Sequence, residues 1–226
     1  MESDEKALIN SFHRLWYSKG QFQMALGEGS DRVVVQMDAR YQGIQVQKNP
    51  LDLWIYQEIL YETKPDLIVE FGTASGGTTL FLAQQGILNG HPTSVISIDI
   101  VDRTEQLPSR DNICYLVGDS VGEEITEALL AEDMSPLFVD KSVMVILDDD
   151  HSTEHVRREL DLYNRLVTKG QYLIVEDTNI DDPLGFGNGP QKAVREFLKE
   201  HPEFEVDKSR EKFLMTWNPN GYLRKK

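Results

Sequence analysis

The sequence predicts a doubly wound α/β fold, in which helices cover both faces of a mostly parallel sheet. Short runs rich in valine and isoleucine recur along the chain without polar alternation, as expected for strands buried on both faces. Longer amphipathic stretches separate them, and strands that alternate with helices form parallel sheets with right-handed crossovers. A length of 226 residues fits one domain with an extension.

Five apolar runs are predicted to be the parallel strands: Asp66–Phe71, Ser94–Ile100, Ile113–Val117, Val143–Asp148 and Tyr172–Glu176. Four amphipathic stretches are predicted to be the helices between and after them: Gly77–Leu88, Gly122–Ala131, Glu154–Thr168 and Gln191–Glu200. The tail differs, because only a short charged segment separates Phe204–Val206 from Phe213–Trp217. We expect these two runs to be terminal strands that pair antiparallel.

Residues 1–63 are expected to form an N-terminal extension packed on the domain of residues 64–226. The extension has a predicted helix near Ala7–Tyr17, an extended piece around Val33–Met37 and a second helix at Leu51–Glu62. Such an extension commonly supplies walls of an acceptor site or contacts between subunits. A homo-oligomer is therefore one expectation.

Composition limits the classes of partner. The chain carries 38 acidic and 23 basic residues, for a formal charge of −15, which disfavours nucleic acid and anionic membranes as partners. The acidic start and the lack of a long apolar run predict a soluble, cytoplasmic protein without a membrane span. The single cysteine, Cys114, rules out an internal disulfide and is interpreted as a core residue.

The first predicted strand runs into a glycine-rich turn, Glu70-Phe-Gly-Thr-Ala-Ser-Gly-Gly-Thr78, at the edge where open α/β sheets bind ligands. The spacing does not match the dinucleotide pattern Gly-x-Gly-x-x-Gly. An acid beside the turn suits the cationic sulfonium and amino group of S-adenosylmethionine. The alternative interpretation is a turn with a structural role only. The expected cofactor contacts here are Glu70, Gly72, Thr73, Gly76, Gly77 and Thr78.

Acids also follow the next two strands. Asp99 is expected to accept hydrogen bonds from the ribose hydroxyls of the cofactor, and Asp119 and Ser120 are expected near its adenine. A strand-terminal aspartate is often only a solvated cap. The succession of such residues after three consecutive strands favours the cofactor interpretation.

A cluster of acids follows the fourth and fifth strands. Asp148 ends the run Val143-Met-Val-Ile-Leu, and Glu176 and Asp177 end the next one, so the three carboxylates should meet. Converging carboxylates repel and raise one another's pKa. Neither strand tip holds a lysine or arginine, so a divalent cation, Mg²⁺ with Mn²⁺ or Ca²⁺ as substitutes, is the simplest neutraliser.

The residues around Asp148 have separate expected roles. His151 could take a proton from an acceptor, while Asp148 is expected to contact both the metal and the cofactor. Asp149 is interpreted as solvated, and either Asp150 or Ser152 as the cap of the next helix. Lys48 is left open as a contact to an acceptor or to the metal acids.

Together these segments resemble the cephalosporin hydroxylase/rhamnosyl O-methyltransferase family of class I methyltransferases, from about Gly43 to Tyr222. The resemblance implies a seven-stranded sheet, S-adenosylmethionine, and a divalent ion held by Asp148, Glu176 and Asp177. The chain is also similar to catechol O-methyltransferases, in which a lysine base stands where His151 stands here. The marks are Lys48-Asn-Pro-Leu-Asp-Leu-Trp54, Pro65-Asp-Leu-Ile-Val-Glu-Phe-Gly-Thr73 with Gly76-Gly77, Asp148-Asp-Asp-His-Ser152, Val175-Glu-Asp-Thr178 and Asn218-Pro-Asn-Gly-Tyr-Leu223.

The expected activity is metal-dependent methyl transfer from S-adenosylmethionine to a hydroxyl of a small molecule such as a sugar, a natural-product glycoside or an antibiotic. His151 and Asp148 are the expected catalytic residues. The glycine-rich loop Asp181–Pro190 is compatible with a lid over the substrate or with a surface loop. Two alternatives are a metal-independent methyltransferase and an accessory protein that binds S-adenosylmethionine without catalysis.

Overall fold

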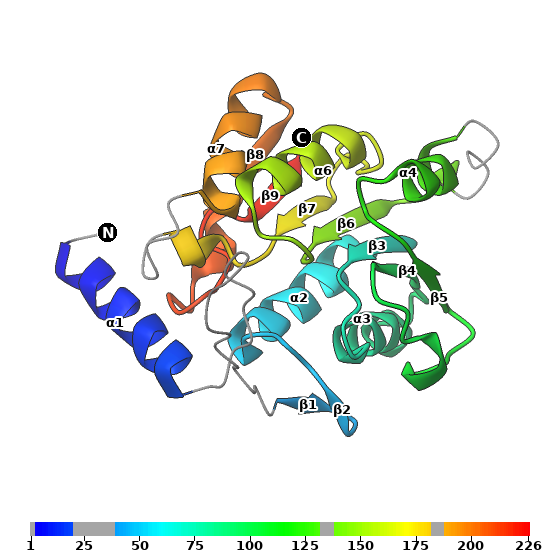
Figure 1. The fold of residues 1–226 in the computed structure, drawn as a ribbon, viewed down its shortest axis with the longest axis horizontal. Helices are drawn as coiled ribbons and strands as arrows, with labels where there is room; N and C mark the ends of the chain where they lie inside the picture. The colour runs from blue at the N-terminus through cyan, green and yellow to red at the C-terminus, as the bar shows by residue number, and fades with distance from the viewer. Residues whose placement is uncertain (1–2, 20–38, 132–137, 182–187) are drawn as a thin grey trace, which may run out of the picture.

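A computed structural model describes residues 3–19, 39–131, 138–181 and 188–226. A seven-stranded sheet with the order β5-β4-β3-β6-β7-β9-β8 lies at its centre (Figure 1). The predicted doubly wound α/β fold is confirmed. The strands are β3 (Leu67–Phe71), β4 (Ser94–Asp99), β5 (Ile113–Val117), β6 (Val143–Leu147), β7 (Tyr172–Val175), β8 (Phe204–Val206) and β9 (Tyr222–Lys225).

The strands from β5 to β7 in this order are parallel, and β9 is antiparallel to both of its neighbours. The predicted antiparallel ending is therefore present, but the assignment of Phe213–Trp217 as its last strand is wrong. Thr216 and the backbone amide of Trp217 bind the side chain of Asp52 instead of a neighbouring strand. Tyr222, buried within β9, supplies the pairing with β7.

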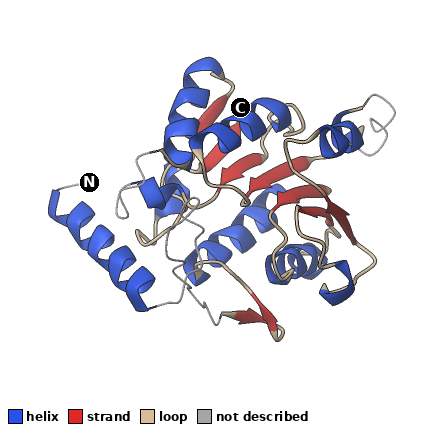
Figure 2. Cartoon of the chain, in the orientation of Figure 1, coloured by secondary structure: helices blue, strands red, loops and turns tan. Residues whose placement is uncertain are grey.

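Helices cover both faces of the sheet (Figure 2). One group of helices covers each face. Successive strand residues point to opposite faces, so Val145 packs against the first group and Met144 against the second. Because apolar residues point both ways, both faces of the sheet are buried. The first group is α4 (Glu123–Leu130), α6 (Thr153–Tyr163) and α7 (Pro190–Glu200), and the second is α2 (Pro50–Thr63) and α3 (Gly77–Leu88).

The helix predicted over Glu154–Thr168 ends earlier, at Tyr163. The side-chain amide of Asn164 donates to the Leu160 carbonyl over 2.7 Å, which occupies an acceptor at the helix end. The Lys225 Nζ atom donates to the carbonyls of Asn164 (3.0 Å) and Val167 (2.9 Å). Contacts to β9, distant in sequence, thus stabilise the turn that follows α6.

The smaller elements lie outside this central sheet. The predicted extended piece Val33–Met37 and most of the loop Asp181–Pro190 fall outside the described residues. Across the described ranges, no helix has both the length and the apolarity that a bilayer crossing needs.

The elements outside the central sheet and its covering helices are α1 (Ser3–Lys19), the hairpin of β1 (Arg40–Tyr41) and β2 (Ile44–Gln45), and the 3₁₀ turns η1 (Thr104–Gln106), η3 (Thr178–Asp181) and η4 (Lys208–Glu211).

Candidate functional site

The carboxyl ends of three adjacent parallel strands define the site. Phe71 of β3 pairs with Leu147 of β6, and Leu147 pairs with Val175 of β7. The loops that begin at residues 72, 148 and 176 therefore leave the sheet side by side. The backbone amides of Asp148 and Glu176 continue the ladder with bonds to Phe71 and Leu147, which holds both acids rigidly.

A lysine from a distant part of the chain lies among these acids. The Nζ atom of Lys48 contacts Asp148 Oδ2 and lies 3.1 Å from Glu176 Oε1. Lys48 is 1% exposed, so its ammonium group is shielded from water. The strand tips themselves hold no lysine or arginine, as predicted, but a protein cation reaches the acids from the segment before α2. Of the two contacts left open for Lys48, the structure shows the one to the acids.

Glu176 is held from a second side by α2. The Tyr56 hydroxyl of this helix donates a hydrogen bond to Glu176 Oε1, the oxygen that faces Lys48. One turn earlier on α2, Asp52 accepts bonds from the Thr216 hydroxyl (2.6 Å) and the Tyr222 hydroxyl (2.9 Å). Burial raises the pKa of Asp52 to about 7, and repulsion from Glu176 adds to the effect.

Asp177, which follows β7 by two residues, has an unusual backbone conformation. Its φ angle is 55°, in the left-handed region that non-glycine residues seldom adopt. The side-chain oxygen of Asn218 accepts a bond from its amide over 2.9 Å, which stabilises this conformation. Oδ2 lies 3.4 Å from His151 Nε2, whereas buried Oδ1 has no hydrogen-bond partner among the described residues.

Three side chains bring their ligand atoms together at this point. The oxygens of Asp148 and Asp177 and a ring nitrogen of His151 all lie within 4.8 Å of one another. Burial raises the pKa of Asp148 well above its usual range, and Glu176 and Asp177 add to this against the pull of Lys48. Burial likewise raises the pKa of Asp177. The cluster is short of positive charge, so a cation that bound here would stabilise it.

The remaining residues of the acidic run have local partners. Ser152 is the cap of α6, because its hydroxyl accepts from the His155 amide over 3.3 Å. Asp150 accepts from the Ser152 amide over 2.7 Å and so supports the cap. Asp149 is not simply solvated, since its Oδ2 lies 3.4 Å from His155 Nε2, which is also 2.8 Å from Ser120 Oγ.

Glu70 is fully buried beneath the glycine-rich turn. Its Oε2 atom accepts bonds from Thr79 (2.5 Å) and Ser97 (2.7 Å), and Ser97 also bonds to Thr73 (2.7 Å). Its Oε1 atom is buried and has no hydrogen-bond partner within the described ranges. Burial raises the pKa of Glu70, and the two hydroxyls oppose this shift. One carboxylate oxygen is therefore left for a donor on a ligand.

The glycines of the turn are required by the protein's own packing. A Cβ atom on Gly72 would lie 2.1 Å from the Asp148 carbonyl oxygen, and its φ of 96° is left-handed. A Cβ on Gly76 would meet Pro108 at 2.7 Å, and one on Gly77 would meet the Gln45 carbonyl at 2.2 Å. Close approach of neighbouring segments thus accounts for all three glycines, and Thr78 beside them is buried.

The acids after β4 and β5 face the same edge of the sheet. Asp99 accepts from the Ala74 amide of the glycine-rich turn and from the Val101 amide, both over 2.8 Å. Asp119 accepts from the Val121 amide over 3.1 Å, and Ser120 is buried beside His155. Each carboxylate oxygen can accept a second hydrogen bond, so these contacts leave Asp99 able to bind hydroxyl groups.

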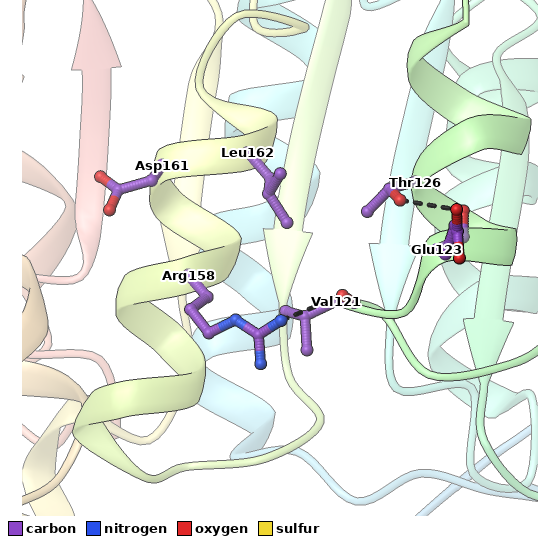
Figure 3. Close-up of a pocket in the computed structure, with 6 residues that line it drawn as sticks. All are labelled: Val121, Glu123, Thr126, Arg158, Asp161 and Leu162. Atoms are coloured by element: carbon purple, nitrogen blue, oxygen red, sulfur yellow. Dashed lines mark hydrogen bonds between the residues drawn. The ribbon is translucent and has the colours of Figure 1, made fainter.

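A separate open groove of about 560 Å³ lies between α4 and α6 (Figure 3). Arg158 crosses it and donates to the Val121 carbonyl over 3.3 Å. No lining residue belongs to the carboxylate cluster, so the groove and the cluster are distinct features. The lining residues are Val121, Glu123, Thr126, Arg158, Asp161 and Leu162.

The carboxylate oxygens of the site suit S-adenosylmethionine and a divalent cation, the two groups that the sequence predicts. The orphaned Oε1 of buried Glu70 fits an amino group, and Asp99 fits ribose hydroxyls. The orphaned Oδ1 of Asp177 and the carboxylate of Asp148 offer hard oxygen ligands of the kind that Mg²⁺ prefers. The residues present therefore fit S-adenosylmethionine and a divalent cation at neighbouring positions.

Comparisons with known proteins identify the family of the chain. The family model described as "Rhamnosyl O-methyltransferase/CmcI" matches residues 33–226. Rhamnosyl O-methyltransferase of Mycobacterium leprae is 36% identical over 192 residues, which cover 82% of each chain. The enzyme of the same description from Mycobacterium tuberculosis is 37% identical over 190 residues, covering 81% of this chain and 76% of the relative.

Solved structures show the same fold. The structure described as "cmcI-D160 Mg-SAM" has a TM-score of 0.62 and 21% identity, and covers 88% of this chain and 82% of that chain. An O-methyltransferase from Bacillus cereus in complex with SAH has a TM-score of 0.51 and 14% identity, with coverage of 70% and 72%. At these identities the likeness concerns the fold alone.

Proposed function

The chain belongs to the rhamnosyl O-methyltransferase/CmcI family and is a S-adenosylmethionine-dependent O-methyltransferase, and we propose that it methylates a sugar hydroxyl with the help of a divalent cation. The observation that carries the cation is the convergence of ligand atoms of Asp148 and Asp177 with His151 within 4.8 Å, while Glu176 lies beside Asp148 through their shared partner Lys48. The relatives' name, together with identity over most of the chain, supports a rhamnosyl or related deoxysugar acceptor.

The cofactor would lie over the glycine-rich turn. Glu70 Oε1, which has no hydrogen-bond partner among the described residues, would accept from its amino group, and the Asp99 carboxylate would accept from its ribose hydroxyls. Asp119 and Ser120 would form the wall on the adenine side, and the Ser120 hydroxyl lies 2.8 Å from His155 Nε2. Thr73 and Thr78 border the turn, and Gly72, Gly76 and Gly77 let its backbone lie against the neighbouring segments. S-adenosylmethionine supplies the methyl group.

Asp148, Glu176 and Asp177 would hold the divalent cation, Mg²⁺ by preference for hard oxygen donors, with Mn²⁺ or Ca²⁺ able to substitute. A cation bound there would lower the pKa of an acceptor hydroxyl. His151 lies on the open side of the cluster, 28% exposed, and takes the proton of that hydroxyl at Nε2. We assign His151 to proton transfer rather than to the cation because Mg²⁺ favours oxygen over imidazole ligands.

A labelled-methyl assay tests this function. The protein is incubated with S-adenosylmethionine carrying a radioactive methyl group and a panel of rhamnosides and other hexosides, with EDTA or with Mg²⁺. We expect label in the sugar with Mg²⁺, little with EDTA, and little with the variant Asp148→Asn. Asp150→Asn is the matched control, because Asp150 is an exposed acid of the same loop that only supports the cap of α6.

Two results would contradict the proposal. Equal transfer in EDTA and Mg²⁺, with full activity of Asp148→Asn, would indicate a metal-independent methyltransferase. Transfer to a small diol without a sugar, in preference to every glycoside tested, would contradict the sugar acceptor while leaving the reaction class intact.

A further inference from the structure

Lys48 is a buried cation for which the proposed reaction has no step. Its Nζ atom contacts Asp148 and lies 3.1 Å from Glu176, and its side chain is 2% exposed. The buried ammonium group is paired with two carboxylates, so it is not placed to take a proton from an acceptor hydroxyl.

Hydrogen bonds of Asn49 and Asp52, at the start of α2, fix the segment that carries Lys48. Asn49 caps the helix by accepting from the Leu51 amide over 3.0 Å, and its amide group donates to the Met215 carbonyl over 2.5 Å. Asp52 adds bonds to Thr216 and to the Trp217 amide. The Lys48 backbone is thus held against the loop before β9, and its side chain reaches the acids from a fixed origin.

The charges of the cluster give Lys48 a second effect. The carboxylates of Asp148, Glu176 and Asp177 offer three negative charges, and the ammonium group of Lys48 balances one of them. A divalent ion would neutralise the remaining two charges, whereas a trivalent ion would leave an excess of positive charge. The interaction between two unit charges a few ångströms apart near a protein surface amounts to about tenfold or more in affinity.

We propose that Lys48 is a positioning residue of the methyl-transfer site, which holds Asp148 and Glu176 in register and sets the charge of the cluster to favour a divalent over a trivalent cation. The inference rests on the proposed function for the divalent cation, but the positioning role does not require any cation to be present. It makes the start of α2 part of the site, although the segment lies about 100 residues from Asp148 in the sequence.

The test compares Lys48→Met with the matched control Lys212→Met. Lys212 pairs with Glu58 of α2 at the surface, so its loss removes an ion pair away from the cluster. In EDTA we expect Lys48→Met to melt about 10 °C below wild type, because its loss leaves buried carboxylates uncompensated, and Lys212→Met to melt within about 2 °C of wild type.

Cation binding is measured by terbium luminescence, with Mg²⁺ as competitor. We expect the ratio of Tb³⁺ to Mg²⁺ affinity to rise about tenfold or more in Lys48→Met and to stay unchanged in Lys212→Met. The gain in melting temperature on adding Mg²⁺ should also be larger in Lys48→Met than in wild type. An unchanged affinity ratio would overturn the effect on cation charge.

The double variant Lys48→Met/Asp148→Asn covers the case in which Lys48→Met does not fold. It removes Lys48 and one of its two carboxylate partners and leaves only Glu176 without its cation, so we expect its melting temperature in EDTA to lie clearly above that of Lys48→Met. Failure of the double variant to recover, or a Lys48→Met that melts like wild type, would overturn the positioning role. Absence of any Mg²⁺ response in wild type would instead overturn the proposed cation, and the EDTA measurements would still decide the role of Lys48.

Discussion

Gly72 packs directly against the backbone of Asp148: a Cβ atom on Gly72 would lie 2.1 Å from the Asp148 carbonyl oxygen. The turn expected to bind the cofactor and the loop expected to bind the cation are therefore in van der Waals contact. The contact follows from the pairing of Phe71 with Leu147, which places the two loops on adjacent strands. A substitution at Gly72 should therefore displace the backbone of Asp148.

We expect Gly72→Ala to lower the free energy of unfolding by more than about 3 kcal/mol, because the added methyl group collides with fixed backbone. The matched control is Gly90→Ala, since Gly90 also has a positive φ, 68°, but open space around its Cβ position. The control should lose only the left-handed strain of about 1–2 kcal/mol. Urea unfolding measures both, and equal losses would show that the contact with Asp148 is unimportant.

We expect Tyr56→Phe to cost about 1.5–3 kcal/mol of stability, because the Tyr56 hydroxyl donates to the buried carboxylate of Glu176. The apparent affinity for Mg²⁺ should change with it. Tyr61→Phe on the same helix is the control, since Tyr61 is 63% exposed. Stability equal to that of Tyr61→Phe would argue against a structural role for the Tyr56 bond.

We expect His151→Ala to lower kcat by about 10²- to 10⁴-fold with little change in cofactor affinity, because the variant lacks the proton acceptor. Its rate should rise with pH as hydroxide takes over the proton transfer. His91→Ala serves as the control, since His91 pairs with Asp66 over 3.2 Å near the starts of the strands. A kcat within about threefold of wild type would remove His151 from the reaction.

Asp52 should make stability depend on pH. Burial raises its pKa from 3.8 to about 7 in the folded state. The folded protein therefore binds this proton more tightly than the unfolded chain, and the resulting stabilisation is lost as pH rises from about 4 to about 7. We expect the slope of unfolding free energy against pH, between pH 4.5 and 7.5, to be less negative in Asp52→Asn than in wild type.

Asp102→Asn is the control for this measurement. Hydrogen bonds from the amide and hydroxyl of Thr104 lower the pKa of Asp102, so its carboxyl group loses its proton mostly below that pH range. Its removal should leave the slope unchanged. A wild-type slope equal to that of Asp52→Asn would contradict the raised pKa of Asp52.

The sequence was sufficient for the central parallel strands because burial on both faces leaves an unbroken apolar run, whereas the edge strand β5 is only partly buried and its Cys114 is exposed rather than in the core. Strand β6 is apolar and buried at every position from Val143 to Leu147, as is typical of a strand covered on both faces. The last strand has no such run. Tyr222 and Leu223 are buried, but Arg224 is exposed and Lys225 partly so, whereas the more apolar run Phe213–Trp217 serves the loop that binds Asp52.

The candidate site was predictable only where its residues follow strands. Asp148, Glu176 and Asp177 could be placed together because adjacent parallel strands end at one edge. Lys48, Asp52 and Tyr56 could not, since their contacts depend on how α2 packs across the sheet. The excess of acids over bases near Asp148 was the available signal that a cation had to come from elsewhere in the chain.

The position of β9 between β7 and β8 has a consequence for how the protein is made. Among the strands of the sheet, β9 is the last to be synthesised, yet it lies between two that emerge from the ribosome earlier. β8 pairs only with β9, so it has no place in the sheet until residues 222–225 are available. Tyr222 is also a partner of Asp52, so the start of α2 gains its full set of contacts only then. A chain whose synthesis stops before residue 222 would therefore lack both the β8–β9 pairing and the hydrogen bond from Tyr222 to Asp52.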